Sequence, residues 1–150
     1  MATIPPEKAP KPGLNIYGRA AVNPDKLTIA AEELGIPYNY IHMDMLAGEP
    51  KTEWYASINP NGRMPAVVHI KEDGTSVTVF ESGSCLLYLA NEFDKEHTLS
   101  YPIAKPEYWT QLSWLSWQFN GYGPMMGQAA YFNRHGMLNL LSAPLSGGGS

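Results

Sequence analysis

Two short stretches decide the fold expected for this chain. Residues 59–65 read NPNGRMP and lead into the apolar run AVVHI at residues 66–70. Residues 80–84 read FESGS and lead into a second apolar run, CLLYLA, at residues 85–90. The first stretch is typical of a turn that ends in a proline at the mouth of a strand, and the second of a strand that passes straight into a helix. We interpret them as two corners rich in free backbone groups that together could hold one small, doubly charged peptide.

Composition narrows the class of protein. The chain has 150 residues, of which 44% are hydrophobic and 16% charged, which is typical of one globular domain or of one domain plus part of another. The formal net charge is -4 and no basic block occurs, which argues against a nucleic-acid partner. Cys85 is the single cysteine, so no intramolecular disulfide is expected.

The N-terminal residues carry no targeting signal that we recognise. Residues 1–12 contain four prolines and no apolar segment, which predicts a loose, disordered arm and neither a signal nor a transit peptide. No apolar run is long enough to cross a membrane. From the sequence we therefore expect no membrane partner and a cytoplasmic location.

Residues 13–94 predict a thioredoxin-like α/β domain with a mixed four-stranded sheet. Strand patterns at residues 14–17 and 38–42 flank a helix whose start is indicated by Asn23 and Pro24 and whose end by Gly35. Strand patterns at residues 66–70 and 76–80 flank a Glu-Asp-Gly turn, and a helix is expected at residues 82–91. The apolar residues of the first helix lie on one face: Leu27, Ala30, Ala31 and Leu34.

The last third of the chain has a different composition. Residues 95–100 are interpreted as a linker and residues 101–141 as a partial all-α domain. A helix is expected from Pro106, a glycine-rich break at residues 121–127, and a second short helix at residues 126–135. Residues 142–150 are rich in serine and glycine, which predicts a disordered tail.

Four blocks of sequence carry a resemblance to a known family: residues 32–38 (EELGIPY), 59–65, 81–89 (ESGSCLLYL) and 121–129 (GYGPMMGQA). The chain resembles the glutathione transferases, and within them the fungal class that includes the yeast nitrogen-catabolite regulator. The resemblance covers residues 14–134, and the last block is the most class-specific. It implies a glutathione-binding thioredoxin-like domain followed by a C-terminally truncated all-α domain.

The resemblance assigns a role to the proline at the end of the first stretch. In the family this proline, here Pro65, is cis, and the preceding residue, Met64, offers its backbone N–H and C=O to the cysteinyl part of glutathione. Proline is the residue at which cis bonds occur. An ordinary trans proline that opens a strand is the alternative.

The second stretch is implied to hold the γ-glutamyl end of glutathione. Glu81 would pair with the ammonium group, and Ser82, at the helix start, would bind the carboxylate. From the residues alone, a serine helix cap beside a solvated acid explains the same pattern. Lys51 and Arg63 are candidates to neutralise the glycyl carboxylate, and each is also typical of a solvated surface charge.

Asn23 is the catalytic candidate that the resemblance implies. Such transferases stabilise the thiolate of bound glutathione, and a donor aimed at sulfur lowers the thiol pKa. Asn23 is also typical of a helix N-cap, and both roles can hold together. Tyr17 is a second candidate donor, although its place in a strand favours the core.

The remaining reactive or bulky side chains are interpreted more simply. The four histidines lack metal-ligand spacing, so no metal or other cofactor is expected beyond glutathione as co-substrate. Cys85 is expected to be buried and inert. The large apolar residues of the last third can form either helical core or the border of an electrophile pocket: Trp114, Trp117, Phe119, Met125 and Met126.

Three functions follow from this reading. The first is a glutathione S-transferase that conjugates glutathione to a small electrophile, for detoxification or fungal secondary metabolism. The second is a non-catalytic glutathione-binding or regulatory protein, and the third an inactive truncated fragment. A homodimer is the assembly that the resemblance implies.

Overall fold

The computed structural model of the protein describes residues 3–142, with side chains described as far as residue 134. The chain divides into two compact units, Met1–Tyr108 and Trp109–Ser150. No helix of the described residues is both long enough and apolar enough to span a bilayer.

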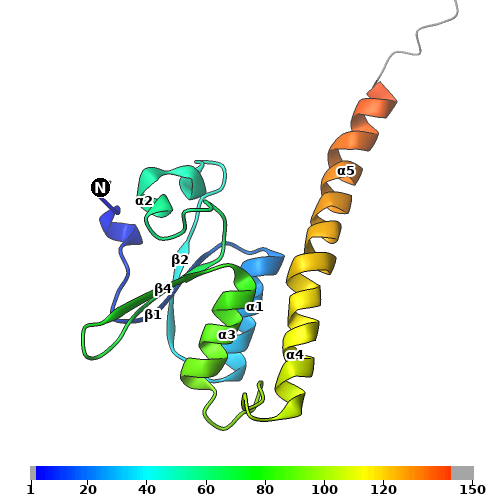
Figure 1. Ribbon diagram of the computed structural model, residues 1–150. Helices are drawn as coiled ribbons and strands as arrows, with labels where there is room; N and C mark the ends of the chain where they lie inside the picture. The colour runs from blue at the N-terminus through cyan, green and yellow to red at the C-terminus, as the bar shows by residue number, and fades with distance from the viewer. Residues whose placement is uncertain (1–2, 143–150) are drawn as a thin grey trace, which may run out of the picture. The chain divides into compact units, whose positions relative to one another are not determined.

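The first unit is built on a mixed four-stranded sheet in the order β2-β1-β3-β4 (Figure 1). β1 (Gly13–Gly18) pairs in parallel with β2 (Tyr38–His42) and antiparallel with β3 (Ala66–Ile70). β4 (Ser76–Phe80) pairs antiparallel with β3 at the edge. The predicted thioredoxin-like fold class is confirmed.

Each face of the sheet buries its own apolar cluster, because side chains alternate along a strand. On one face α1 (Val22–Glu33) and α3 (Ser82–Phe93) lie side by side, and Leu27, Ala31 and Leu89 pack against Ile16 and Val67. On the other face the short helix α2 (Glu53–Ala56) buries its aromatic residues against the sheet. That second cluster consists of Tyr17, Ile41, Met43, Trp54, Tyr55, Ile58, Ala66 and Val68.

The N-terminal arm differs from the expectation of disorder. Residues 6–8 form a turn of 3-10 helix, η1 (Pro6–Lys8), and a second such turn, η2 (Glu49–Lys51), lies beside it. The Lys8 ammonium donates to the Glu49 carboxylate at 2.9 Å, and the Tyr17 hydroxyl donates to the Lys8 carbonyl at 2.8 Å. These contacts join sequence-distant groups, which is why the proline-rich composition did not reveal them.

The helices of the last third join without a break, so the predicted interruption at residues 121–127 and the short helix at 126–135 are wrong. α4 (Pro106–Trp117) continues through a π-helical turn, η3 (Gln118–Tyr122), into α5 (Gly123–Ser142). The N–H of Gly123 donates to the Gln118 carbonyl, and a Cβ on Gly123 would lie 2.9 Å from that oxygen. Glycine here permits the tight π turn and does not end the helix. The predicted tail at 142–150 lies outside the described residues except for Ser142.

The large side chains of this helix are mostly exposed. Trp114 and Trp117 are 65% and 54% exposed, and Met125 and Met126 are 71% and 53% exposed. Phe119 is half-buried. In the part of the chain that the structure describes, these four residues therefore do not form helical core, which was one of the two roles expected for them.

The segment after α3 is organised by one buried carboxylate. Asp94, 3% exposed, accepts hydrogen bonds from Thr98 N–H at 2.6 Å, Leu99 N–H at 2.9 Å and the Ser100 hydroxyl at 2.7 Å. Burial opposes ionisation of this group, but the hydrogen bonds from Ser100 and from the backbone outweigh it and lower the carboxyl pKa. Asp94 therefore determines the path of residues 95–100, which the sequence marks as a linker.

We expect Asp94→Asn to destabilise the protein by about 1–3 kcal/mol at neutral pH, because it leaves buried donors poorly satisfied. A carboxyl whose folded pKa is lowered contributes stability above its unfolded pKa and loses it as the pH falls. The deficit of the variant should therefore shrink as the pH falls below about 4. Urea unfolding at a series of pH values measures it.

The matched control is Asp73→Asn, at the exposed β3–β4 turn, where the carboxylate accepts bonds from Thr75. It should cost less than half as much. Equal losses in the two variants would contradict the role given to Asp94.

Candidate functional site

The candidate residues meet at one edge of the sheet. The register pairs Tyr17 with Ala66 and Ala66 with Phe80, so the end of β1, the start of β3 and the end of β4 lie together. The segments attached to these strand ends are the start of α1, residues 59–65 and the start of α3. The antiparallel register is therefore what brings residues 23, 64 and 82 into one region.

Asn59 holds the loop that precedes β3. It is 1% exposed; its Oδ1 accepts from the Asn61 N–H at 3.0 Å, and its Nδ2 donates to the Arg63 carbonyl at 2.6 Å. The Tyr55 hydroxyl donates to the same carbonyl at 2.9 Å. The Asn59 amide and the Tyr55 hydroxyl thus hold the Arg63 carbonyl, and with it the peptide group that follows, from the buried side.

Met64 offers an open pair of backbone groups. The Met64–Pro65 peptide is cis, as the resemblance implies. Among the residues that the structure describes, none pairs with the N–H or C=O of Met64, which lies just before the β3 ladder begins at Ala66. A donor and an acceptor on an extended backbone can pair with a peptide ligand as an added strand would.

The start of α3 is uncapped, and the expectation that Ser82 caps it is wrong. Glu81 occupies the cap position, Ser82 is the first helical residue, and no side chain of the described chain caps this end. The first helical bond runs from Cys85 N–H to the Glu81 carbonyl at 2.9 Å. The N–H groups of residues 82–84 therefore remain available to an anion.

Glu81 adopts a backbone conformation that side chains rarely take, with φ of 70° and ψ of 125°. Its carboxylate is exposed and accepts from the Asn61 amide at 2.8 Å. This bond links the loop before β3 to the start of α3. Positive φ at a non-glycine residue costs about 1–3 kcal/mol and often marks functional sites.

Asn23 is not the N-cap of α1, contrary to one reading of the sequence. Ala21 occupies that position, and the Asp25 carboxylate accepts its N–H at 3.3 Å. The Asn23 Oδ1 instead accepts from the Lys26 ammonium at 2.9 Å, and within residues 3–134 no partner is seen for the Asn23 NH₂. An exposed amide donor is thus left at the sheet edge.

Gly18 sets how closely α1 approaches the sheet. A Cβ on Gly18 would lie 2.7 Å from the Cβ of Pro24 and 3.1 Å from the Tyr40 hydroxyl. Any larger residue would push the first turn of α1 outward. The absence of a side chain at the end of β1 therefore determines where Asn23 stands.

The two candidate cations lie near the loop before β3. Gly62 has φ of 60°, and the Lys51 Nζ lies 3.2 Å from the point where a Cβ on Gly62 would be. The Lys51 and Arg63 side chains are both exposed. Their position is compatible with binding a carboxylate, and the structure does not bring them into contact with Glu81 or Ser82.

Two alternative reactive groups are buried. The Tyr17 side chain is fully buried, its hydroxyl is bonded to Lys8, and burial raises its pKa to about 12. Burial also raises the pKa of the Cys85 thiol to about 12. Tyr17 is therefore a core residue and no donor to a ligand sulfur, and Cys85 is inert as expected. The described residues contain no cluster of potential metal ligands.

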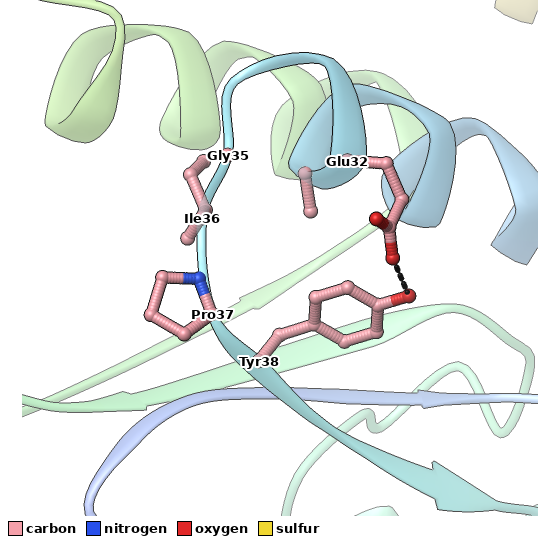
Figure 2. A pocket seen from close by; sticks show the side chains of 6 residues that line it. Glu32, Gly35, Ile36, Pro37 and Tyr38 are labelled. Carbon is pink, nitrogen blue, oxygen red and sulfur yellow. Dashed lines mark hydrogen bonds between the residues drawn. The ribbon is translucent and has the colours of Figure 1, made fainter.

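A wide, shallow hollow lies elsewhere, where α1 turns into β2 (Figure 2). Its volume is about 770 Å³, and the Tyr38 hydroxyl donates to Glu32 at 2.9 Å beside it. The hollow is lined by Ala31, Glu32, Gly35, Ile36, Pro37 and Tyr38. None of the candidate site residues belongs to it, so the size of a hollow does not identify the site here.

Sequence reasoning missed three residues of the site. In the sequence, Asn59 is interpreted only as part of a turn, although an asparagine in such a turn commonly binds nearby backbone. Lys26 stands three residues after Asn23 on a helix, a spacing that brings side chains together and could have revealed the pair. The bond between Asn61 and Glu81 has no local signal, because it joins residues 20 positions apart.

Comparison with known proteins identifies the domain. Residues 23–92 match the glutathione S-transferase N-terminal domain. This match assigns residues 23–92 to the glutathione S-transferase N-terminal domain. The residues that meet at the sheet edge lie within this match, from Asn23 to Ser82.

Relatives and solved structures agree with this assignment. The chain is 34% identical over 122 residues to the glutathione S-transferase-like protein gedE of Aspergillus terreus, covering 81% of this chain and 52% of that protein. It is 34% identical over 135 residues to the transcriptional regulator URE2 of Saccharomyces cerevisiae, covering 84% and 36%. The glutathione transferase URE2P6 of Phanerochaete chrysosporium, solved with oxidized glutathione, has a TM-score of 0.77 at 39% identity, covering 83% and 56%.

These matches confirm the resemblance to the fungal class that includes the nitrogen-catabolite regulator. They also bound it, because the chain spans about half the length of the transferase-like relative and less of the regulator. The activity, substrates and partners of the full-length relatives are therefore only proposals for this chain.

The backbone at Glu81 yields a prediction for stability. Glu81→Gly and Glu81→Ala both lose the bond to Asn61, but only glycine relaxes the positive φ. We expect the glycine variant to be more stable by about 1 kcal/mol, a difference in Tm of about 4–8 °C for a unit of this size. Calorimetry of the two variants measures it.

Glu33, the last residue of α1, is the control, because there glycine is the poorer helix former. Glu33→Gly should be less stable than Glu33→Ala, the reverse order. An alanine variant at least as stable as the glycine variant at position 81, as is expected at position 33, would show that Glu81 carries no backbone strain.

Proposed function

We propose that the protein binds glutathione at this sheet edge and conjugates its thiolate to a small electrophile, in detoxification or in fungal secondary metabolism. The observation that supports it most is the open Met64 backbone beside the uncapped start of α3. Together they match the two features that a γ-linked peptide presents, an extended amide and a carboxylate.

Each of the three parts of glutathione would contact a different set of groups on the protein. The cysteinyl amide would pair with Met64 N–H and C=O next to Pro65. The γ-glutamyl carboxylate would bind Ser82 and the N–H groups that follow, and its ammonium the Glu81 carboxylate. The glycyl carboxylate would lie near Lys51 and Arg63.

Asn23 would supply the chemistry. A free thiol has a pKa of about 8.5 and is mostly protonated at neutral pH. A hydrogen bond from the Asn23 NH₂ to sulfur would favour the thiolate and lower that pKa. The thiolate would then attack the electrophilic carbon, forming the C–S bond while the leaving group departs with the electron pair of the broken bond.

A glutathione-binding protein without turnover is the alternative. It is favoured by the similarity to URE2, which is named as a transcriptional regulator. Both functions would use the same binding groups, and only activation of the thiol separates them. A homodimer is a proposal that rests on the family resemblance alone, and a cytoplasmic location is a proposal that rests on the sequence alone.

The test is a thermal melt of the whole 150-residue chain with and without glutathione. Glutathione at 100 times its Kd should add about 2.7 kcal/mol of stability. We expect Ser82→Ala to lose most of this stabilisation, because the hydroxyl and the shape of the anion site change. Ser84→Ala, at an exposed serine two residues further along the helix, is the matched control and should keep it.

Turnover then separates the two functions. With chlorodinitrobenzene as electrophile, the wild type should form the conjugate, whereas Asn23→Ala should bind glutathione and lose most of the rate. Glutathione stabilisation without conjugation in the wild type would favour the regulatory function. A cooperative melt that glutathione does not shift would overturn the proposed site.

A further inference from the structure

One ammonium group joins two of the candidate site residues. The Lys26 Nζ lies 2.9 Å from the Asn23 Oδ1 on the same helix and 3.4 Å from the Ser82 Oγ at the start of α3. Ser82 is 7% exposed, and Lys26 is half-buried, with burial lowering its pKa. A partly desolvated cation therefore sits between the amide proposed to face sulfur and the hydroxyl proposed to bind a carboxylate.

The chemistry of the two groups determines how the amide is turned. An ammonium group has three donors and no acceptor, whereas a primary amide has a carbonyl oxygen on one branch and an NH₂ on the other. The side of Asn23 that faces Lys26 must be the oxygen. The NH₂ is then directed the opposite way. An amide turned over would present its oxygen to a thiolate and repel it.

We propose that Lys26 is a positioning residue for glutathione activation, which holds the Asn23 amide with its NH₂ toward the sulfur and adds positive charge at the start of α3. This inference rests on the proposed function and deepens it. Lys26 acts through Asn23 and need not touch the sulfur itself.

The neighbouring titratable groups do not displace Asn23 or Ser82 from the Lys26 ammonium. Asp25, on the same turn, uses its carboxylate to accept the Ala21 N–H. Glu81, at the start of α3, accepts from Asn61. Tyr40, on β2 near Gly18, keeps its proton because burial raises its pKa. Lys26 is thus the cation that these two helix starts contribute.

Three substitutions separate orientation from charge. Lys26→Met keeps the aliphatic stem and removes both donor and charge, Lys26→Gln keeps a donor without charge, and Lys26→Arg keeps both. The readouts are the pKa of the bound glutathione thiol, from the ultraviolet absorbance of the thiolate against pH, and the glutathione Kd from titration. A residue with only a structural role would not move the thiol pKa.

We expect Lys26→Met to raise the bound thiol pKa by about one unit, which is tenfold less thiolate at a given pH below the pKa. Lys26→Gln should lie between Met and wild type, and Lys26→Arg should restore most of the effect. If the cation acts through Asn23, Lys26→Met should add little to the loss in Asn23→Ala, so the double variant would be strongly non-additive.

The outcomes distinguish this inference from the proposed function. If the wild type binds glutathione and Lys26→Met leaves the pKa of the bound thiol unchanged, the role of Lys26 is overturned and the proposed function is not. Fully additive losses in the double variant also overturn positioning and leave only a charge effect. No binding of glutathione by the wild type overturns both proposals.

Discussion

Every candidate site residue depends on one register of the sheet, in which Gly18, Ala66 and Phe80 end or begin their strands at the same edge. A slip of one residue would turn each strand's side chains to the opposite face. It would expose both apolar clusters and separate the start of α1 from the start of α3. Burial on both faces of the sheet therefore stabilises the site.

The site itself consists largely of backbone groups that the fold leaves open. Asn59 and Tyr55 hold the Arg63 carbonyl from the buried side, and no group of the described residues pairs with the backbone N–H or C=O of the next residue, Met64. At the start of α3 the cap position is occupied by Glu81, whose side chain does not cap the helix and whose backbone has a positive φ. Positive φ at a non-glycine residue costs free energy and is most often found at functional sites.

The same framework serves a transferase and a glutathione-binding regulator, since fold alone does not determine function. The difference would lie in how the ligand sulfur is treated. Here the amide of Asn23 is held by Lys26, which also approaches Ser82. Binding and activation would thus be coupled through one side chain on α1, whatever the electrophile.

The sequence by itself determined the order of strands and helices, the turn before β3 and the resemblance to the glutathione transferases, because these depend on local patterns of polarity, proline and glycine. It misjudged both helix starts and the π turn at residues 118–122, since capping and helix continuity depend on hydrogen bonds that several residue types can make. Only the tertiary structure decided that Asn61 meets Glu81 and that Lys26 meets Ser82. Such contacts join residues 20 and 56 positions apart, and their geometry is set by the packing of helices on the sheet and by no local preference.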